Sequence, residues 1–139
     1  MDSQDHGWLA LWAADCAEHV LPRFEEERPT DARPRRAVEA GRAWARGEIT
    51  MSQARAAAFD AHAAAREADR AEAQAAARAA GHAAATAHVA THAPHATAYA
   101  VKAAAQTAGA TSPSSAATEE REWQYRRLPE PLRPMAFPT

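Results

Sequence analysis

The chain has 139 residues, which suits one domain of ordinary size, and its formal charge of −2 arises from 16 basic and 18 acidic residues. The basic residues form no stripe, so nucleic acid is not an expected partner, and charges interrupt the apolar runs too often for a membrane span. A lone cysteine, Cys16, and a polar N-terminus without a secretory signal predict a reduced, cytoplasmic protein.

Alanine dominates the composition, with 42 of the 139 positions, whereas β-branched residues are few. This balance favours helices over strands and predicts an all-α fold. Because alanine is small, the helices must approach one another closely, and the few large side chains must fill the gaps. Trp12, Trp44 and Trp123 are the expected fillers, while Trp8, near the terminus, is the best candidate for exposure.

The N-terminal segment is expected to begin with a flexible stretch, residues 1–6. Residues 7–21 then show apolar side chains at helical spacing and predict a first helix, which ends or kinks at Pro22. The apolar face of this helix comprises Leu9, Trp12, Ala13, Cys16 and Val20. Cys16 is therefore expected to be a buried thiol.

Two further helices are predicted before residue 70. Thr30 or Asp31 can cap the second helix, and Gly47 closes it. The segment 50–53 begins with Thr and ends with Gln, a capping pattern that predicts the start of a third helix. This third helix should end near Glu67, where a polar patch favours a turn.

A fourth helix is predicted to start at Ala71 and to run past residue 88. Pro94 then marks a break, and a fifth helix follows and ends at Gly109. The fourth helix presents a stripe of mostly small residues at steps of three and four, a pattern typical of close helix packing. The stripe comprises Ala77, Gly81, Ala84, Ala85, His88 and His92.

The C-terminal part is predicted to hold one more helix. Residues 111–115 are rich in serine and predict a loop, and a short sixth helix near Ser115 should include Trp123 and Leu128. Residues 129–139 contain four prolines and are expected to form a tail without regular helix. The sequence thus predicts a compact, single-domain bundle of five or six Ala-rich helices over residues 7–128.

Histidines form the sharpest candidate site. His88, His92 and His95 follow one another at steps of four and three, which would place three imidazoles on one helix face, and His82 lies six residues before His88. Such a group suits a metal-binding protein or a metal-dependent enzyme. Histidines at this spacing are common in helices, however, so we favour packing or surface roles and expect no bound metal or cofactor.

Two other groups combine charges with aromatic rings. Asp15 and His19 lie one helical turn apart, which suits either proton transfer or a simple ion pair. A second stripe, on the third helix, predicts a solvated edge with its phenylalanine turned inward, or else a partner-binding patch. It comprises Arg55, Phe59, His62 and Arg66.

Five stretches of the sequence are distinctive when taken together: residues 12–22 (WAADCAEHVLP), 43–47 (AWARG) and 79–89 (AAGHAAATAHV), followed by Trp123-Gln124 and Leu128-Pro129. They resemble a bacterial family of immunity proteins from polymorphic toxin systems. The resemblance covers residues 8–132. It implies a protein without chemistry of its own that protects the cell by binding and blocking a cognate toxin.

Exposed side chains are the expected anchors for such a partner. We select an aromatic residue and three charged ones, because large or charged side chains concentrate binding energy and steer association. They are Trp8, Glu26, Arg66 and Glu120. The histidine-based metal site remains the alternative function, and self-association through the small-residue stripe is a third possibility.

Overall fold

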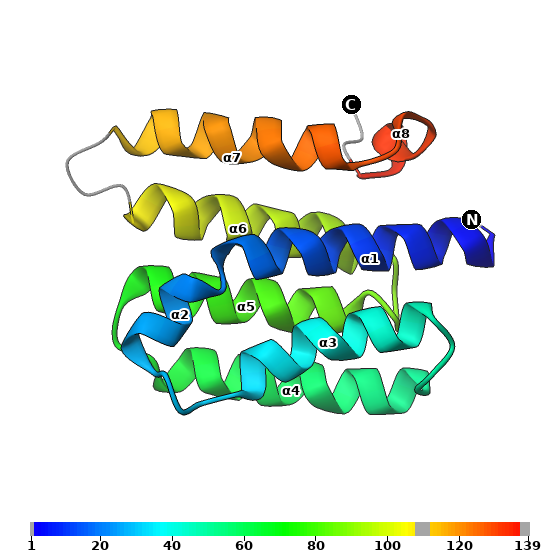
Figure 1. Cartoon of the computed structure of the whole chain (residues 1–139), viewed down its shortest axis with the longest axis horizontal. Coiled ribbons are helices and arrows are strands. Elements are labelled where there is room, and N and C mark those ends of the chain that lie inside the picture. The colour runs from blue at the N-terminus through cyan, green and yellow to red at the C-terminus, as the bar shows by residue number, and fades with distance from the viewer. Residues whose placement is uncertain (1, 108–111, 137–139) are drawn as a thin grey trace.

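The computed structural model describes residues 2–107 and 112–136, and every regular element in these ranges is helical. In chain order the elements are α1 (Ser3–Val20), α2 (Pro22–Glu27), α3 (Arg33–Ala45), α4 (Met51–Glu67), α5 (Ala71–Ala85), α6 (His92–Thr107), α7 (Pro113–Arg127), a 3-10 turn η1 (Glu130–Leu132) and α8 (Arg133–Ala136). Six of these helices are long, so the predicted all-α bundle is confirmed (Figure 1). None of the described helices is both long and apolar enough to cross a membrane.

The first helix starts earlier than predicted. α1 begins at Ser3, because the side chain of Asp2 accepts a hydrogen bond from the backbone N–H of Asp5 (2.8 Å) and so caps the helix. Residues 3–6, which we expected to be a flexible stretch, are therefore helical. Pro22 ends α1 as predicted and also starts α2, where its missing N–H would have no helical partner.

The helix boundaries between residues 30 and 70 follow the predicted capping signals closely. Gly47 adopts a φ of 76°, the left-handed conformation that closes a helix, directly after α3. Thr50 and Gln53 form the predicted reciprocal capping box at the start of α4. The start of α3 differs, because Ala32 rather than Asp31 occupies the cap position.

The prediction for the fourth helix was wrong at its end. α5 stops at Ala85, and residues 86–91 form a linker, so His88 lies outside the helix. The break comes before Pro94 rather than at it. Pro94 instead occupies the first turn of α6, which begins at His92, because backbone N–H groups in a first turn need no helical acceptor.

The C-terminal tail packs against the bundle, contrary to our expectation of a segment without helix. Pro131 and Pro134 occupy the second positions of η1 and α8, within the first turn, where a helix tolerates proline. Leu132 and Ala136 are buried and anchor it. The predicted end of the fifth helix at Gly109, the loop residue Thr111 and the tail residue Pro138 lie outside the described residues.

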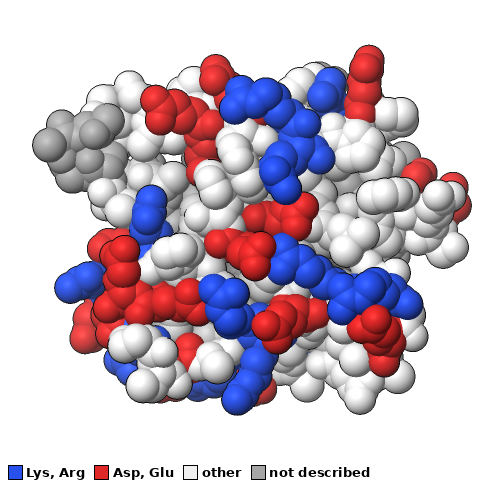
Figure 2. Space-filling model, in the orientation of Figure 1, with Lys and Arg blue, Asp and Glu red and all other residues white. Residues whose placement is uncertain are grey.

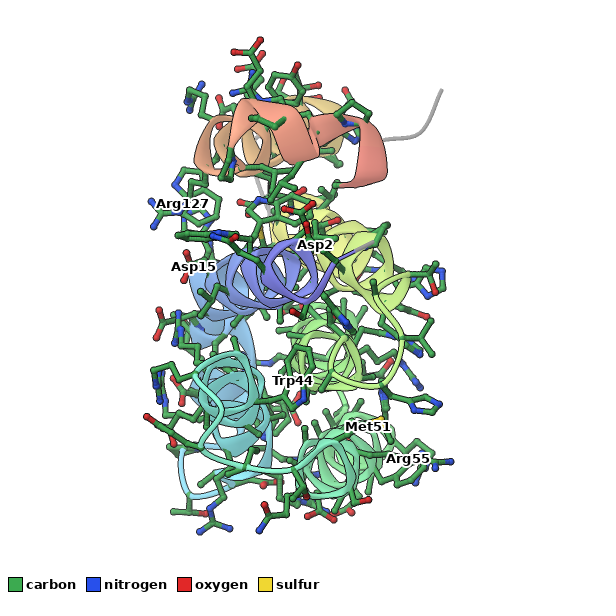
Figure 3. All side chains as sticks on the ribbon, turned by 90° about the vertical axis from the view of Figure 1, so that its right-hand side faces the viewer. Asp2, Asp15, Trp44, Met51, Arg55 and Arg127 are labelled. Carbon is green, nitrogen blue, oxygen red and sulfur yellow. The ribbon has the colours of Figure 1, made fainter. Side chains whose placement is uncertain are left out.

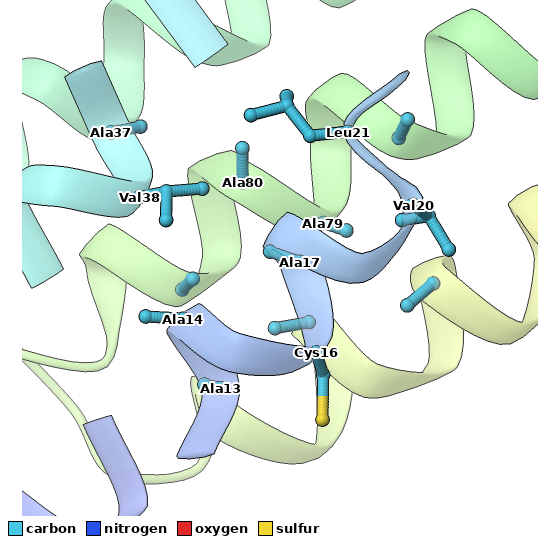
Figure 4. Close-up of a cluster of buried hydrophobic side chains, with 14 of the residues drawn as sticks. Ala13, Ala14, Cys16, Ala17, Val20, Leu21, Ala37, Val38, Ala79 and Ala80 are labelled. Carbon is cyan, nitrogen blue, oxygen red and sulfur yellow. The ribbon is translucent and has the colours of Figure 1, made fainter. Parts of the chain in front are cut away.

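The centre of the bundle is α5, which is built almost entirely from small residues. It packs against α1, α2, α3, α4 and α6, and its buried Ala80 lies beside Val38 (Figure 4). A Cβ atom on Gly41 would lie 3.2 Å from the carbonyl oxygen of Ala83, so α3 and α5 approach one another backbone to backbone. Small residues thus set the spacing of the whole fold.

The large side chains fill the edges of this alanine core. Trp12 is buried, and its Nε1–H donates a hydrogen bond to the carbonyl oxygen of Gln124 (2.8 Å). The Gln124 side chain in turn donates to the carbonyl oxygen of Thr97 (2.9 Å), which links α7 to α6. Trp44 and Trp123 are half-buried. The helices α7 and α4 form opposite edges of the bundle (Figure 1).

Candidate functional site

The face formed by α1, α2 and α3 carries charges that pair with one another, and we call it the ion-paired face. The guanidinium of Arg42 donates to Asp15 (2.8 Å) and to Glu18 (2.9 Å), and its hydrogen bonding to Glu18 lowers the pKa of that carboxyl. Arg35 binds both carboxylate oxygens of Glu25 at 2.8 Å. Figure 2 shows the basic and acidic groups interleaved over this face. Its charges are therefore largely satisfied within the protein.

Three consecutive glutamates end α2, at residues 25–27, and Glu27 stabilises the start of another helix. Its carboxylate accepts hydrogen bonds from the backbone N–H groups of Asp69 (3.0 Å) and Arg70 (2.6 Å) at the start of α5. The first N–H groups of a helix lack internal acceptors and carry partial positive charge, so this carboxylate stabilises the start of the central helix. Glu26 points to solvent and remains free for other contacts.

A second face carries most of the histidines, and we call it the histidine face. His82 near the end of α5 meets His92 and His95 from the first turns of α6. One ligand nitrogen from each of the three rings lies within 4.8 Å of the other two, and the Nδ1 atoms of His82 and His92 are 3.0 Å apart. Three imidazoles on two helices thus converge at one point.

Aromatic rings hold this cluster in place. The ring of Tyr99 stacks on His82 with centroids 5.3 Å apart, and His62 from α4 meets His82 edge to face at 4.9 Å. Gly81 makes room for the His62 ring, because a Cβ atom there would lie 2.6 Å from its Cε1. Burial, reinforced by the neighbouring imidazoles, lowers the pKa of His82 to about 3. Burial also lowers the pKa values of His62 and His92, so these rings are neutral near pH 7.

The position of His88 corrects the predicted metal site. We placed His88, His92 and His95 on one helix, but the linker 86–91 turns His88 away from the cluster. Its Nδ1 lies 3.4 Å from the sulfur of Met51 at the start of α4. His82, predicted as a fourth member, takes its place. The cluster therefore forms between two helices instead of along one.

Exposed apolar side chains lie beside the cluster on the histidine face. Phe59 is 60% exposed, Met51 42% and Val89 40%, and the guanidinium of Arg55 covers the Phe59 ring at 5.3 Å from its centroid. We call these four residues the apolar strip. Figure 3 shows Met51 and Arg55 on the side opposite to Asp15. Phe59 thus points outward, so our expectation that it faces the core was wrong.

The four predicted partner-binding residues do not form one surface. Trp8 on α1 is 47% exposed, and Glu26 on α2 and Arg66 on α4 also face solvent. Glu120 on α7 is only 6% exposed, so it is no exposed anchor. Because α4 and α7 form opposite edges of the bundle, Arg66 and Glu120 lie far apart (Figure 1).

Glu120 instead pairs with a histidine beside a groove. Its carboxylate lies 2.8 Å from Nδ1 of His19, which we had grouped with Asp15. The His19 ring stacks on Trp123 with centroids 3.7 Å apart, and Arg127 covers Trp123. The pair lines a surface groove of about 460 Å³. Such a pair can hold or transfer a proton, but here it also joins α1 to α7.

The sequence was compared with models of known protein families. A family model described as "Imm-5 like putative immunity protein" matches residues 1–131. The chain belongs to this immunity-protein family. The match spans α1 to α7 and so includes both faces and the groove, and it confirms the resemblance noted in the sequence. No curated protein and no solved structure matches the chain.

Sequence reasoning missed two features of this family member for the same reason. The capping of α5 by Glu27 and the pairing of His19 with Glu120 join residues 42 or more positions apart. Helical periodicity reports which residues share a face of one helix, but it carries no information about which helix lies opposite. The residues next to Glu120 in the sequence therefore do not indicate that it is buried or that it pairs with His19.

Proposed function

We propose that this protein acts in the bacterial cytoplasm as an immunity protein that binds a cognate toxin and blocks it without catalysing a reaction. Membership of the immunity family supports the proposal, and the apolar strip is the observation that carries it. A chain with so few large apolar residues leaves three of them exposed on one face. Exposed apolar groups that lie together mark sites of protein association.

The charges of the two faces favour the apolar strip as the toxin-binding surface. On the ion-paired face, arginines and carboxylates already bind one another, so a partner would have to displace internal ion pairs. On the histidine face, the structure records no ion pair for Arg55 or Arg66 among the described residues. A partner can therefore bind the strip by packing on Phe59 and by pairing its carboxylates with the guanidinium groups of Arg55 and Arg66.

The test is co-expression with the product of the adjacent gene in a growth assay, followed by pull-down and measurement of the dissociation constant. We expect the protein to rescue growth and to bind the toxin. Phe59→Ala should weaken binding at least about tenfold, or about 1.4 kcal/mol, because an exposed aromatic anchor is lost. Trp8→Ala, on α1, is the matched control and should bind normally.

Two outcomes separate the parts of this proposal. If the adjacent gene product is harmless alone, or kills equally well in the presence of this protein, the immunity function is wrong. If rescue occurs but Trp8→Ala weakens binding and Phe59→Ala does not, the function stands and the assigned surface is wrong.

A further inference from the structure

We propose that His82, His92 and His95 form a binding site for one divalent transition-metal ion of the zinc class. Each residue contributes one imidazole nitrogen, and the three nitrogens lie within 4.8 Å of one another. Around a tetrahedral zinc ion with Zn–N bonds of about 2.0–2.1 Å, ligand nitrogens are separated by about 3.3 Å. The 3.0 Å between the Nδ1 atoms of His82 and His92 is close to that value, whereas the bound of 4.8 Å for all three nitrogens is wider, so side-chain rotation has to draw the three rings together around the ion.

The third ring of the cluster, His95, meets both of the others edge to face. One neutral imidazole can donate a hydrogen bond to another, and this explains the contact between His82 and His92. A hydrogen-bonded pair has no need of a third ring, yet His95 meets His82 at a centroid distance of 5.4 Å and His92 at 5.7 Å. A shared metal ion accounts for all three positions at once.

Aromatic neighbours hold one ring of the site in position. Tyr99 and His62 pack against the His82 ring and fix its orientation. This ring is thus preorganised, which reduces the conformational entropy that binding has to overcome.

The ligand set selects the class of metal. Imidazole nitrogens suit zinc, copper, nickel and cobalt, whereas calcium and magnesium require oxygen ligands, and no carboxylate belongs to the cluster among the described residues. His95 is exposed, so the fourth coordination position faces solvent and is open to water or another ligand. The site does not depend on toxin binding, although it adjoins the apolar strip.

Cobalt and zinc titrations of the full chain, prepared without a histidine tag, test the site. Co²⁺ reports four-coordinate geometry through its visible absorption, and equilibrium dialysis with Zn²⁺ gives the stoichiometry. We expect one ion per chain. The double variant His92→Ala/His95→Ala should lower Zn²⁺ affinity by more than the roughly 10–100-fold that loss of an outer hydrogen-bonding partner costs.

His88→Ala is the matched control, because His88 is close in sequence but faces Met51 instead of the cluster. Its affinity should equal that of the unmodified protein. If the double variant does not fold, as judged by circular dichroism, the single exposed variant His95→Gln takes its place. Absence of stoichiometric binding, unchanged affinity in the cluster variant, or an equal loss in His88→Ala overturns the proposal.

Discussion

The ion-paired face and the histidine face are both built on α5, yet they treat their polar and apolar groups in opposite ways. On the first, Arg42 and Arg35 bind carboxylates of α1 and α2, and the apolar Phe24 is buried. On the second, Phe59 is exposed and three imidazoles gather without a carboxylate. The charged groups of the ion-paired face bind one another, whereas the histidine face leaves side chains available for a ligand or a partner.

The difference shows how an alanine-rich bundle can separate stability from recognition. Small residues on α5 bring the helices together, so the few large side chains are not all needed for the core. A phenylalanine and a methionine can then stand on the surface. The predictions below test whether the two faces really divide these roles.

The two phenylalanines should give the largest contrast in stability. Phe24→Ala removes a fully buried ring that anchors α2, so we expect a loss of about 3–5 kcal/mol in the free energy of unfolding. Phe59→Ala removes an exposed ring and should change it by less than about 0.5 kcal/mol. Urea unfolding of both variants measures the difference. Similar losses for the two would show that Phe59 belongs to the core.

Overpacking α5 should disturb both faces together. Ala84 is fully buried, so Ala84→Leu forces neighbouring helices apart and should cost about 1–3 kcal/mol. Gly81→Leu should act similarly. It should also displace the His62 ring, because a Cβ atom at position 81 would lie 2.6 Å from the Cε1 atom of that ring. Thermal unfolding gives the measurement, with Ala98→Leu on the exposed side of α6 as the control. Unchanged melting temperatures for Ala84→Leu and Gly81→Leu would contradict this packing.

Most of the fold could be predicted from local signals. The capping box at Thr50, the closing Gly47 and the proline at the end of α1 each act within a few residues, and all appear in the structure as predicted. The predicted end of α5 was wrong because proline stops a helix when it lies in the interior but is favourable in the first turn, where Pro94 lies. Its sequence position alone does not distinguish these roles.

The candidate site was harder to predict because it depends on which helices meet. Spacing grouped His88 with His92 and His95, whereas the linker 86–91 replaces His88 by His82. Hydropathy likewise placed Phe59 inside the bundle. With alanine filling the core, a large apolar residue need not be buried, and composition cannot show which one remains outside.

The ion pairs of the first face should contribute modestly and respond to salt. Arg42 bridges two carboxylates and is largely covered, so Arg42→Ala should cost about 1 kcal/mol at low ionic strength and less at high salt. Arg46 pairs with Glu48 on the open surface, and Arg46→Ala, as the control, should cause no measurable change. Equal changes in the free energy of unfolding for the two variants would show that the ion pairs of Arg42 contribute no more than an exposed pair does.

The smallest expected effect is a dependence of stability on pH that comes from two carboxyl groups, Glu18 beside Arg42 and Asp31 beside Arg33. Hydrogen bonds from Arg42 lower the pKa of Glu18 below its ordinary value of 4.5, and those from Arg33 lower that of Asp31. The unfolded chain therefore takes up protons at a higher pH than the folded protein does. This contribution to stability is present above about pH 4.5 and is lost as the pH falls through the lowered folded pKa values. Urea unfolding from neutral pH down to about pH 3 should show the loss, and in Arg42→Ala the part due to Glu18 should be absent. Parallel curves for the two proteins would mean that Glu18 gains no stabilisation from Arg42.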